Sequence, residues 1–236
     1  MSDHIHTIPV LDALREPQGC AFCAMKEKLE NDAVQFMMGP SYMEDDVRME
    51  TNRVGFCKRH MEAMYSHQNR LGLGLMLHTY MQQLNKDIGN ITEGRVPVSF
   101  FAKDQSGTLS KIKNHLEKNK NSCYVCRKVE KTFGRYIDTF FYLWSKGGDE
   151  AKLISSQKGY CLPHFVELLS AAENLSRGKR EKFLNEILPS WQRLFTETEE
   201  DLDWFVQKFD HRNADEPWKN SKDALPRTIA LLGGRK

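Results

Sequence analysis

Residues 123–146 read CYVCRKVEKTFGRYIDTFFYLWSK, and this stretch decides the fold. It opens on a Cys-x2-Cys pair and then places apolar side chains at the spacing of a helix, at Val129, Phe133, Ile137, Phe140 and Phe141. Residues three or four apart share one face of a helix, and Gly147-Gly148 follows as a stop signal. The stretch therefore predicts an amphipathic helix that begins beside two thiols.

The same plan occurs earlier in the chain, at residues 20–38. Cys20 and Cys23 form the second Cys-x2-Cys pair, and Gly39-Pro40 provides the stop. The apolar side chains that recur at helical spacing are Met25, Leu29, Ala33, Phe36 and Met37. Two such helices, in a chain with a single strand-like segment, predict an all-α fold.

A Cys-x2-His pair follows each Cys-x2-Cys pair, after 33 residues in the first case and 34 in the second. A glycine and an aromatic residue stand directly before the cysteine both times, in Gly55-Phe56-Cys57 with His60 and in Gly159-Tyr160-Cys161 with His164. Each pair is expected to open a helix, since Pro163 suits a first helical turn. Residues three apart share a helix face, so both side chains of a pair can point at one ion.

This pattern uses every cysteine of the chain and predicts eight metal ligands. They are Cys20, Cys23, Cys57, His60, Cys123, Cys126, Cys161 and His164. Three thiolates and one imidazole suit tetrahedral zinc, and four protein ligands leave no coordination position for a substrate water. We therefore expect two structural Zn2+ ions per chain. An iron–sulfur cluster is the alternative cofactor, because some centres accept histidine beside cysteine.

The spacing leaves two ways to pair the ligands. In a sequential arrangement, each Cys-x2-Cys pair shares an ion with the Cys-x2-His pair that follows it. In a cross-braced arrangement, Cys20 and Cys23 join Cys161 and His164 instead. The nearly equal gaps favour the sequential arrangement, because each repeat is then one self-similar module.

The repeat also predicts a division of the chain into four segments. Residues 1–92 hold the first helical metal-binding unit and residues 123–212 the second, with a linker and connecting helix at 93–122 and a C-terminal tail at 213–236. Each unit alone is too small to bury its apolar stripe well. The two pseudo-repeated units are therefore expected to pack around an approximate twofold axis and a shared core.

Finer expectations concern single elements. The linker contains the strand-like piece, residues 96–101. In the first unit, one helix is expected to continue from Met61 past Gly72 and Gly74, and in the second a helical run is expected to break at Pro189. The chain then ends in a helix with core positions Leu202, Phe205 and Phe209 and a short docking helix that carries Ile229, Leu231 and Leu232.

The composition bounds the class of protein. Among 236 residues, 34 basic and 32 acidic side chains give a formal charge of +2, too small to argue for a polyanion partner. No export signal opens the chain, and the longest apolar stretch, residues 71–81, contains two glycines and His78. We expect a cytoplasmic protein without a membrane span. Free thiols that hold metal fit that reducing compartment, and three disulfides are the alternative.

The sequence contains few motifs that are typical of enzymes. No Gly-rich phosphate loop, nucleophile elbow or His-Glu-x2-His motif occurs. The expected role is non-enzymatic binding of a macromolecule, with a protein as partner and the loop expected at residues 39–48 as the best candidate surface. All ten methionines lie in residues 1–81 and are expected to fill the core. The alternatives are a thiol redox protein and a nucleic-acid-binding protein that uses the basic stretch at residues 111–131.

Beside the ligand pairs, the chain carries further distinctive runs. They are Ile5-His6-Thr7-Ile8-Pro9-Val10, residues 39–48, Lys208-Phe209-Asp210-His211-Arg212-Asn213, Glu216-Pro217 and Lys222-Asp223-Ala224. Together with the Cys-x2-Cys pair at Cys20 and with Gly55-Phe56-Cys57 and His60, these runs resemble an uncharacterised bacterial family, a domain of unknown function. The resemblance covers nearly the whole chain. It implies the boundaries and the metal quartets, but no activity.

Overall fold

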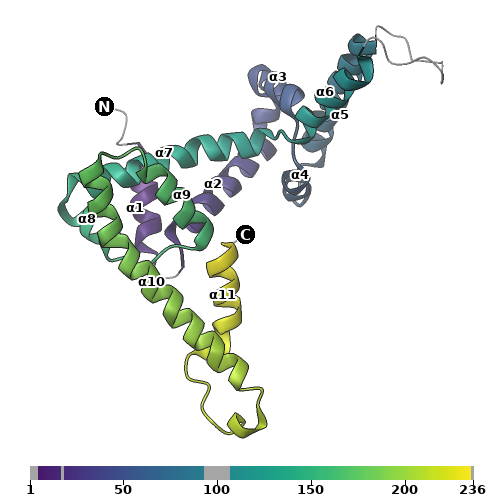
Figure 1. Ribbon diagram of the computed structural model, residues 1–236. Coiled ribbons are helices and arrows are strands. Elements are labelled where there is room, and N and C mark those ends of the chain that lie inside the picture. Colours follow the sequence, from purple (N-terminus) through teal and green to yellow (C-terminus); the bar gives the residue numbers. More distant parts are fainter. Residues whose placement is uncertain (1–4, 17–18, 93–106, 235–236) are drawn as a thin grey trace. The chain divides into compact units, whose positions relative to one another are not determined.

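The computed structural model describes residues 5–16, 19–92 and 107–234, and all regular structure in these residues is helical (Figure 1). The α-helices are α1 (Thr7–Arg15), α2 (Ala21–Met38), α3 (Asp45–Val54), α4 (Lys58–Tyr65), α5 (Arg70–Thr92), α6 (Thr108–Lys120), α7 (Tyr124–Lys146), α8 (Gly148–Ser155), α9 (Leu162–Ala172), α10 (Arg177–Gln207) and α11 (Ala224–Gly233). Three short 3-10 helices are η1 (Pro40–Met43), η2 (His211–Asn213) and η3 (Ser221–Asp223). The all-α prediction is confirmed, while the strand-like piece at 96–101 lies outside the described residues.

The chain forms two compact units that alternate along the sequence. Unit 1 consists of residues 1–28 and 133–236, and unit 2 of residues 29–132. The boundaries fall inside α2 and α7, so both helices contribute to both units. The four predicted segments follow the repeat in the sequence and not the compactness of the fold. They therefore stay a prediction. The pseudo-repeat, the twofold axis and the shared core stay predictions as well.

Unit 1 has an aromatic core. Phe22 is 1% exposed, and the centre of its ring lies 5.2 Å from that of Phe140, 5.4 Å from that of Tyr160 and 5.9 Å from that of Phe133, each pair edge to face. Such pairs contribute about 1 kcal/mol each beyond the burial of their area. Three segments distant in sequence therefore meet at the Phe22 side chain.

Unit 2 has a core of methionine and aliphatic side chains. Met37, Met64 and Val125 are fully buried there, and Phe56 packs in the same cluster. Methionine fills irregular gaps because it is unbranched and flexible. The expected use of methionine as core filler thus holds for the buried positions. It does not hold for Met43, Met49 and Met81, which are mostly exposed.

Most of residues 39–48 are helical rather than a loop, and here the sequence-based interpretation is wrong. They form η1 and the start of α3, whose buried positions are Val47, Thr51 and Val54. Asp45 and Asp46 occupy its first turn, where carboxylates interact favourably with the helix dipole. The acidic residues thus mark a helix start.

Three other helix expectations need correction. The helix after Cys57 ends at Tyr65, and α5 begins separately at Arg70. In contrast, α10 continues through Pro189, which is exposed, and Trp191 beyond it stacks on Phe165. The positions expected in the core near the end of α10 are only partly buried, and Phe209 is 75% exposed. The predicted C-terminal helix is confirmed as α11.

Candidate metal centres

The eight predicted ligands lie in two groups of four. Cys20, Cys23, Cys161 and His164 form site 1, within unit 1; Cys57, His60, Cys123 and Cys126 form site 2, within unit 2. In each group the ligand atoms all lie within 4.8 Å of one another, so a single ion can contact all four. The sequential pairing favoured by the spacing is therefore wrong, and the cross-braced arrangement is the one present.

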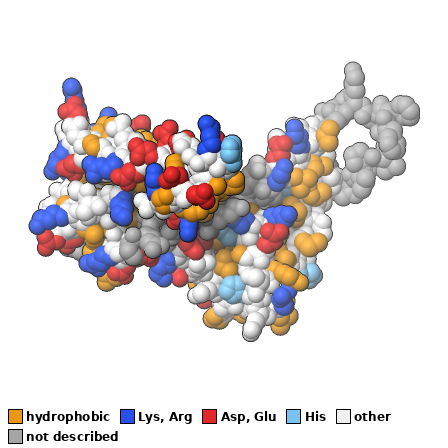
Figure 2. Space-filling model, turned by 90° about the horizontal axis from the view of Figure 1, so that it is seen from below, with side chains coloured by type: hydrophobic (Ala, Val, Ile, Leu, Met, Phe, Trp, Pro, Cys, Tyr) orange, Lys and Arg blue, Asp and Glu red, His pale blue; other side chains and the backbone are white. Residues whose placement is uncertain are grey.

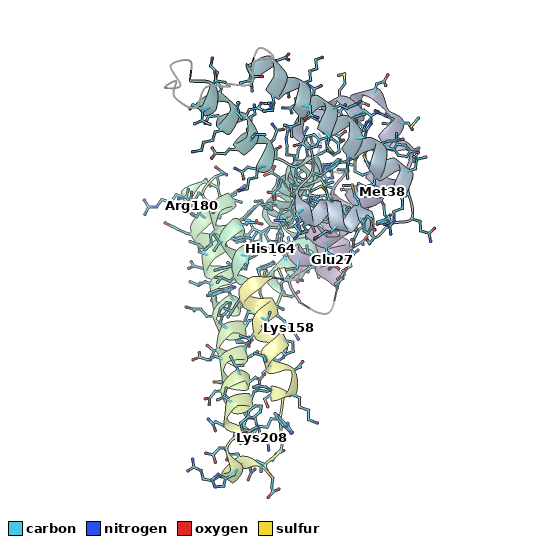
Figure 3. All side chains as sticks on the ribbon, turned by 90° about the vertical axis from the view of Figure 1, so that its right-hand side faces the viewer. Glu27, Met38, Lys158, His164, Arg180 and Lys208 are labelled. Atoms are coloured by element: carbon cyan, nitrogen blue, oxygen red, sulfur yellow. The ribbon has the colours of Figure 1, made fainter. Side chains whose placement is uncertain are left out.

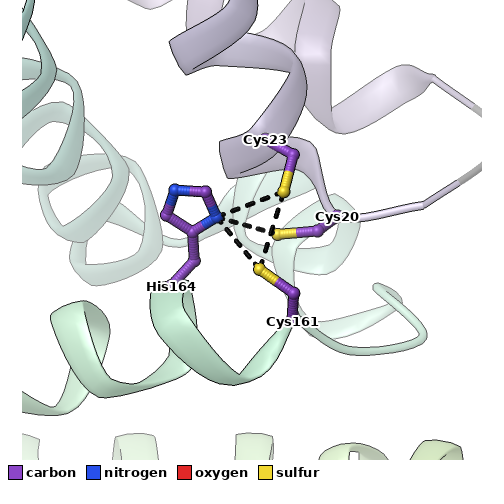
Figure 4. Close-up of side chains that lie close together, drawn as sticks. All are labelled: Cys20, Cys23, Cys161 and His164. Carbon is purple, nitrogen blue, oxygen red and sulfur yellow. Dashed lines mark hydrogen bonds between the residues drawn. The ribbon is translucent and has the colours of Figure 1, made fainter. Parts of the chain in front are cut away.

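Site 1 joins the start of α2 to the start of α9. The Nδ1 atom of His164 lies 3.6 Å from the sulfur of Cys20, 3.3 Å from that of Cys23 and 3.1 Å from that of Cys161 (Figure 4). The sulfurs of Cys23 and Cys161 are 3.5 Å apart. All four side chains point at one common position.

Site 2 joins the start of α4 to the start of α7 in the same way. The Nδ1 atom of His60 lies 3.2 Å from the sulfur of Cys57, 3.3 Å from that of Cys123 and 3.4 Å from that of Cys126. The sulfurs of Cys57 and Cys126 are 3.9 Å apart. Since a disulfide requires about 2.05 Å, neither these cysteines nor those of site 1 form disulfides.

The residues before each Cys-x2-His pair explain how the third ligand is held. Gly55 ends α3 with φ +62°, and Gly159 has φ +146°, both in a region that side chains other than glycine rarely adopt. The aromatic residues that follow, Phe56 and Tyr160, are buried in the core of their unit. Each cysteine thus follows a glycine turn and a buried aromatic ring, and it is the N-cap residue of the next helix.

Backbone contacts hold the two halves of site 2 together. The Tyr124 N–H donates to the Gly55 carbonyl at 2.9 Å, and the Ser122 hydroxyl donates to the Val54 carbonyl at 2.5 Å. These bonds attach the end of α3, which leads into Cys57, to the start of α7. The ligand pairs are therefore placed by the protein itself.

The two sites differ in their cover. All four ligands of site 1 are buried, and a β-carbon built on Gly234 would lie 3.7 Å from the sulfurs of Cys23 and Cys161. The C-terminal end of α11 therefore lies over the site 1 thiols. In site 2, Cys57 and Cys126 are partly exposed and line a shallow hollow of about 900 Å3. A hollow of about 680 Å3 adjoins site 1, but the three cysteines of site 1 are at most 9% exposed.

Within site 1, the net effect of burial and hydrogen bonding favours the protonated forms of the Cys20 thiol and the His164 imidazole. Hydrogen bonding with Cys161 and Cys23, together with burial, raises the pKa of the Cys20 thiol. Burial acts to lower the pKa of His164, but hydrogen bonds with Cys161 and Cys23 outweigh it and raise that pKa to about 9. Three thiolates in one buried cluster therefore need a cation to stabilise them.

Site 2 has a different balance. Burial and the neighbouring Cys123 raise the pKa of the Cys126 thiol to about 12. For Cys57 burial again acts upward, but hydrogen bonding to His60, Cys123 and Cys126 outweighs it, and the pKa is lowered. Burial, helped by the charge of Arg59, lowers the pKa of His60, so this imidazole stays neutral and able to ligate.

Some neighbours of the ligands were not anticipated. Glu167 lies on the helix of His164, with its carboxylate 3.9 Å from the His164 Nε2 atom and 3.5 Å from the Lys26 ammonium. Its position three residues after His164 is the signal that could have indicated it. The Nε2 atom of His60 is buried and has no hydrogen-bond partner among the described residues.

A family model of unknown function matches residues 1–236. The chain belongs to this family, DUF6062. The predicted resemblance to a domain of unknown function is thus confirmed, and the DUF6062 description names no activity. No curated protein and no solved structure matches the chain. For this DUF6062 member, function must therefore be inferred from the two sites.

Other segments singled out in the sequence lie apart from the ligand groups. In this DUF6062 chain, residues 39–48 supply no ligand to either group, and the basic stretch at 111–131 contributes only Cys123 and Cys126. Within the described residues, no helix combines the length and the apolarity that crossing a membrane requires.

Proposed function

We propose that this chain is a structural zinc protein in which each of two Zn2+ ions joins the starts of two helices distant in sequence, and that its role is non-enzymatic binding of a protein partner. The observation that carries the zinc assignment is the set of distances between ligand atoms. With Zn–S about 2.3 Å and Zn–N about 2.05 Å, a regular tetrahedron has N···S edges of about 3.6 Å and S···S edges of about 3.8 Å. The N···S distances here are 3.1 to 3.6 Å, and the S···S distance is 3.5 Å between Cys23 and Cys161 and 3.9 Å between Cys57 and Cys126.

The compactness of the quartets favours one ion over a cluster. An iron–sulfur cluster spreads its protein ligands over several metal atoms, whereas each quartet here fits within 4.8 Å. The ligand chemistry, three thiolates and one imidazole, also suits zinc. A single ion per site therefore explains the geometry better than the cluster alternative.

The closed ligand set supports a structural rather than a catalytic role. Catalytic zinc keeps one position open for water or substrate, and each quartet here already supplies four protein ligands. The bound ion would stabilise the helix starts and would have no coordination position for a substrate. A reducing cytoplasm, where the thiols stay available for metal, fits this role.

The experiment that tests the zinc assignment is elemental analysis with an absorption spectrum, on protein purified without oxygen. Two zinc ions per chain and no visible absorption are the expected result. Iron and sulfide with a band near roughly 400 nm would overturn the zinc assignment in favour of a cluster. Protein that folds fully without any metal would contradict the structural role.

The partner is proposed to bind at residues 39–48 and the adjoining part of α3. Met43 and Met49 are 63% and 72% exposed there, and methionine adapts to varied partners. A photo-crosslinker at Met43 should trap a partner, whereas one at Met81, also exposed, should not. Equal trapping at both positions would contradict the assignment.

The nucleic-acid alternative finds less support in the contacts of the basic stretch. Arg127 is paired with Glu50 at 2.8 Å, and the Lys128 ammonium lies 3.3 Å from the centre of the Phe36 ring. Two of the cations are thus already engaged within the protein. On the face drawn in Figure 2, basic and acidic side chains are interspersed rather than separated. Phosphate binding would need a larger free basic surface.

A further inference from the structure

We propose that Cys57 and Cys126 of site 2 form an oxidation site, at which hydrogen peroxide oxidises the two thiolates to a disulfide and thereby releases the ion of that site. The inference rests on the proposed zinc function and adds to it a reaction of one site only. It rests on a difference in solvent exposure between two ligand sets that have the same residue types.

The first step of the argument is access. Cys57 and Cys126 are the partly exposed ligands of the eight, and both line the hollow of about 900 Å3 beside site 2. Hydrogen peroxide is small and uncharged, so the mixed charges of that hollow, with Lys120 and Arg127 beside Glu50, do not repel it. Oxidation of cysteine follows thiolate character and exposure. Zinc keeps these sulfurs as thiolates, and the hollow exposes them.

The second step is proximity. The sulfurs of Cys57 and Cys126 are 3.9 Å apart, and they belong to different helix starts. A disulfide needs about 2.05 Å between them, so a movement of about 2 Å brings them together. Both ligands lie in the first turn of a helix or directly before it, where a small rotation of the side chain changes the sulfur position. Sulfur oxidised at one residue is therefore within reach of a resolving thiol at the other.

The reaction balances with the peroxide as the oxidant. The Cys57 sulfur attacks one peroxide oxygen; an S–O bond forms, the O–O bond breaks, and the leaving hydroxide takes a proton to become water. The Cys126 thiolate then attacks the Cys57 sulfur; an S–S bond forms, the S–O bond breaks, and a second hydroxide leaves and becomes water. Two thiolates lose two electrons in total, and one peroxide is reduced to two waters. The zinc stays divalent and departs, because two ligands remain.

Site 1 serves as the internal control for this chemistry. It has the same ligand types, and its Cys23 and Cys161 sulfurs are closer, at 3.5 Å. Proximity alone would thus favour oxidation of site 1. Its thiols, however, are buried beneath the end of α11, where Gly234 approaches both sulfurs. Solvent access therefore predicts that site 2 is oxidised first, whereas proximity of the sulfurs predicts that site 1 is oxidised first. The measured order distinguishes the two explanations.

The experiment is a peroxide titration of the full chain, purified without oxygen and first analysed for its metal content. Released zinc is followed with a metal indicator, and the cysteines are mapped by differential alkylation and mass spectrometry. We expect one of the two ions to be lost in a first phase, in which Cys57 and Cys126 become linked while Cys20, Cys23 and Cys161 stay reduced. Addition of a dithiol together with zinc should then reduce the disulfide and restore the ion of site 2.

A matched pair of ligand replacements sharpens the test. Cys57→His keeps four ligands at site 2 but removes one partner of the disulfide, and Cys161→His makes the same change at the corresponding position of site 1. The Cys57→His protein should keep its site 2 zinc at a peroxide concentration that empties this site in the unchanged protein. The Cys161→His protein should still lose its site 2 zinc.

The outcomes distinguish the two proposals. If the protein contains no zinc before peroxide is added, the proposed zinc function is contradicted. Protein that contains two zinc ions but loses both together, loses that of site 1 first, or forms a Cys123–Cys126 disulfide overturns the oxidation site alone. If Cys57→His does not fold, the mapped order in the unchanged protein still decides the matter.

Discussion

At the scale of single residues, Gly55 shows how a turn positions a ligand. Its φ of +62° lets α3 end and the chain reverse into Cys57 within two residues. A β-carbon at this position would lie 2.5 Å from the Cζ atom of Tyr80, closer than packed atoms can come. Gly55 is therefore required both by its backbone angle and by the ring beside it.

Replacing Gly55 with alanine should lower the free energy of unfolding by about 1–3 kcal/mol, because the backbone strain and the clash with Tyr80 add. The matched control is Gly134→Ala, in the exposed middle of α7, where a β-carbon meets nothing within 4 Å. That change should stabilise the protein by about 0.5–1 kcal/mol. Denaturant unfolding of both variants decides the point, and equal effects would refute this account of Gly55.

Metal affinity should fall as the pH falls. In the metal-free protein the pKa of Cys126 is about 12 and that of His164 about 9, so both carry a proton at neutral pH. Binding requires both to be deprotonated and therefore releases protons, and the affinity should rise about tenfold per pH unit for each proton released. Competition with a chromophoric chelator between about pH 6 and 8 measures this slope. An affinity independent of pH would contradict the involvement of these side chains.

At the scale of elements, the turn after α10 depends on one lysine. Lys208 is 8% exposed, and its ammonium donates to the carbonyls of Asn213, Ala214 and Glu216 at 2.5, 2.8 and 2.6 Å. It lies at the end of α10, which runs beside α11 (Figure 3). The lysine thus closes the connection that returns the chain from one helix to the other.

Replacing Lys208 with methionine should destabilise this connection by about 2 kcal/mol, since three hydrogen bonds to a charged donor are lost. The control is Lys222→Met, at an exposed position that follows the turn. It should change stability by less than about 0.5 kcal/mol. Thermal unfolding and hydrogen exchange of α11 are the measurements, and unchanged protection of α11 in Lys208→Met would contradict the proposed role.

At the scale of the whole molecule, each candidate metal site joins segments that are distant along the chain. Site 1 links ligands 138 to 144 residues apart, and site 2 links ligands 63 to 69 residues apart. An ion bound only to the folded state stabilises it by mass action. Loss of either ion should therefore weaken contacts between remote parts of the chain.

Pairs of cysteine replacements test this pairing through metal content. Cys20→Ser combined with Cys161→Ser removes two ligands of site 1, so one ion should remain. Cys20→Ser combined with Cys57→Ser damages both sites, and no ion should remain. Sequential pairing predicts the reverse result, and elemental analysis of the two double variants separates the alternatives.

The sequence by itself determined the helical class, helices α2 and α7, and the eight cysteine and histidine positions that form the two candidate metal sites. The physical reason is that these features are local. Helical periodicity sets α2 and α7, Cys-x2-Cys and Cys-x2-His spacing places two ligands within one turn, and Gly-aromatic marks the turn before the third ligand. Even α3, which was missed, carries a local signal in Asp45, Asp46 and the closing Gly55.

The tertiary structure alone decided which ligand pairs meet and how far each site is covered. Equal spacing in the sequence allows either pairing, because it does not say which helix starts pack together. Burial of side chains beside the ligands makes that choice: Phe22 and Tyr160 share the aromatic core next to site 1, and Phe56 and Val125 share the core next to site 2. The burial of site 1 likewise depends on Gly234, which is 70 residues from His164 in the sequence. A pattern of local spacing contains no information on such contacts.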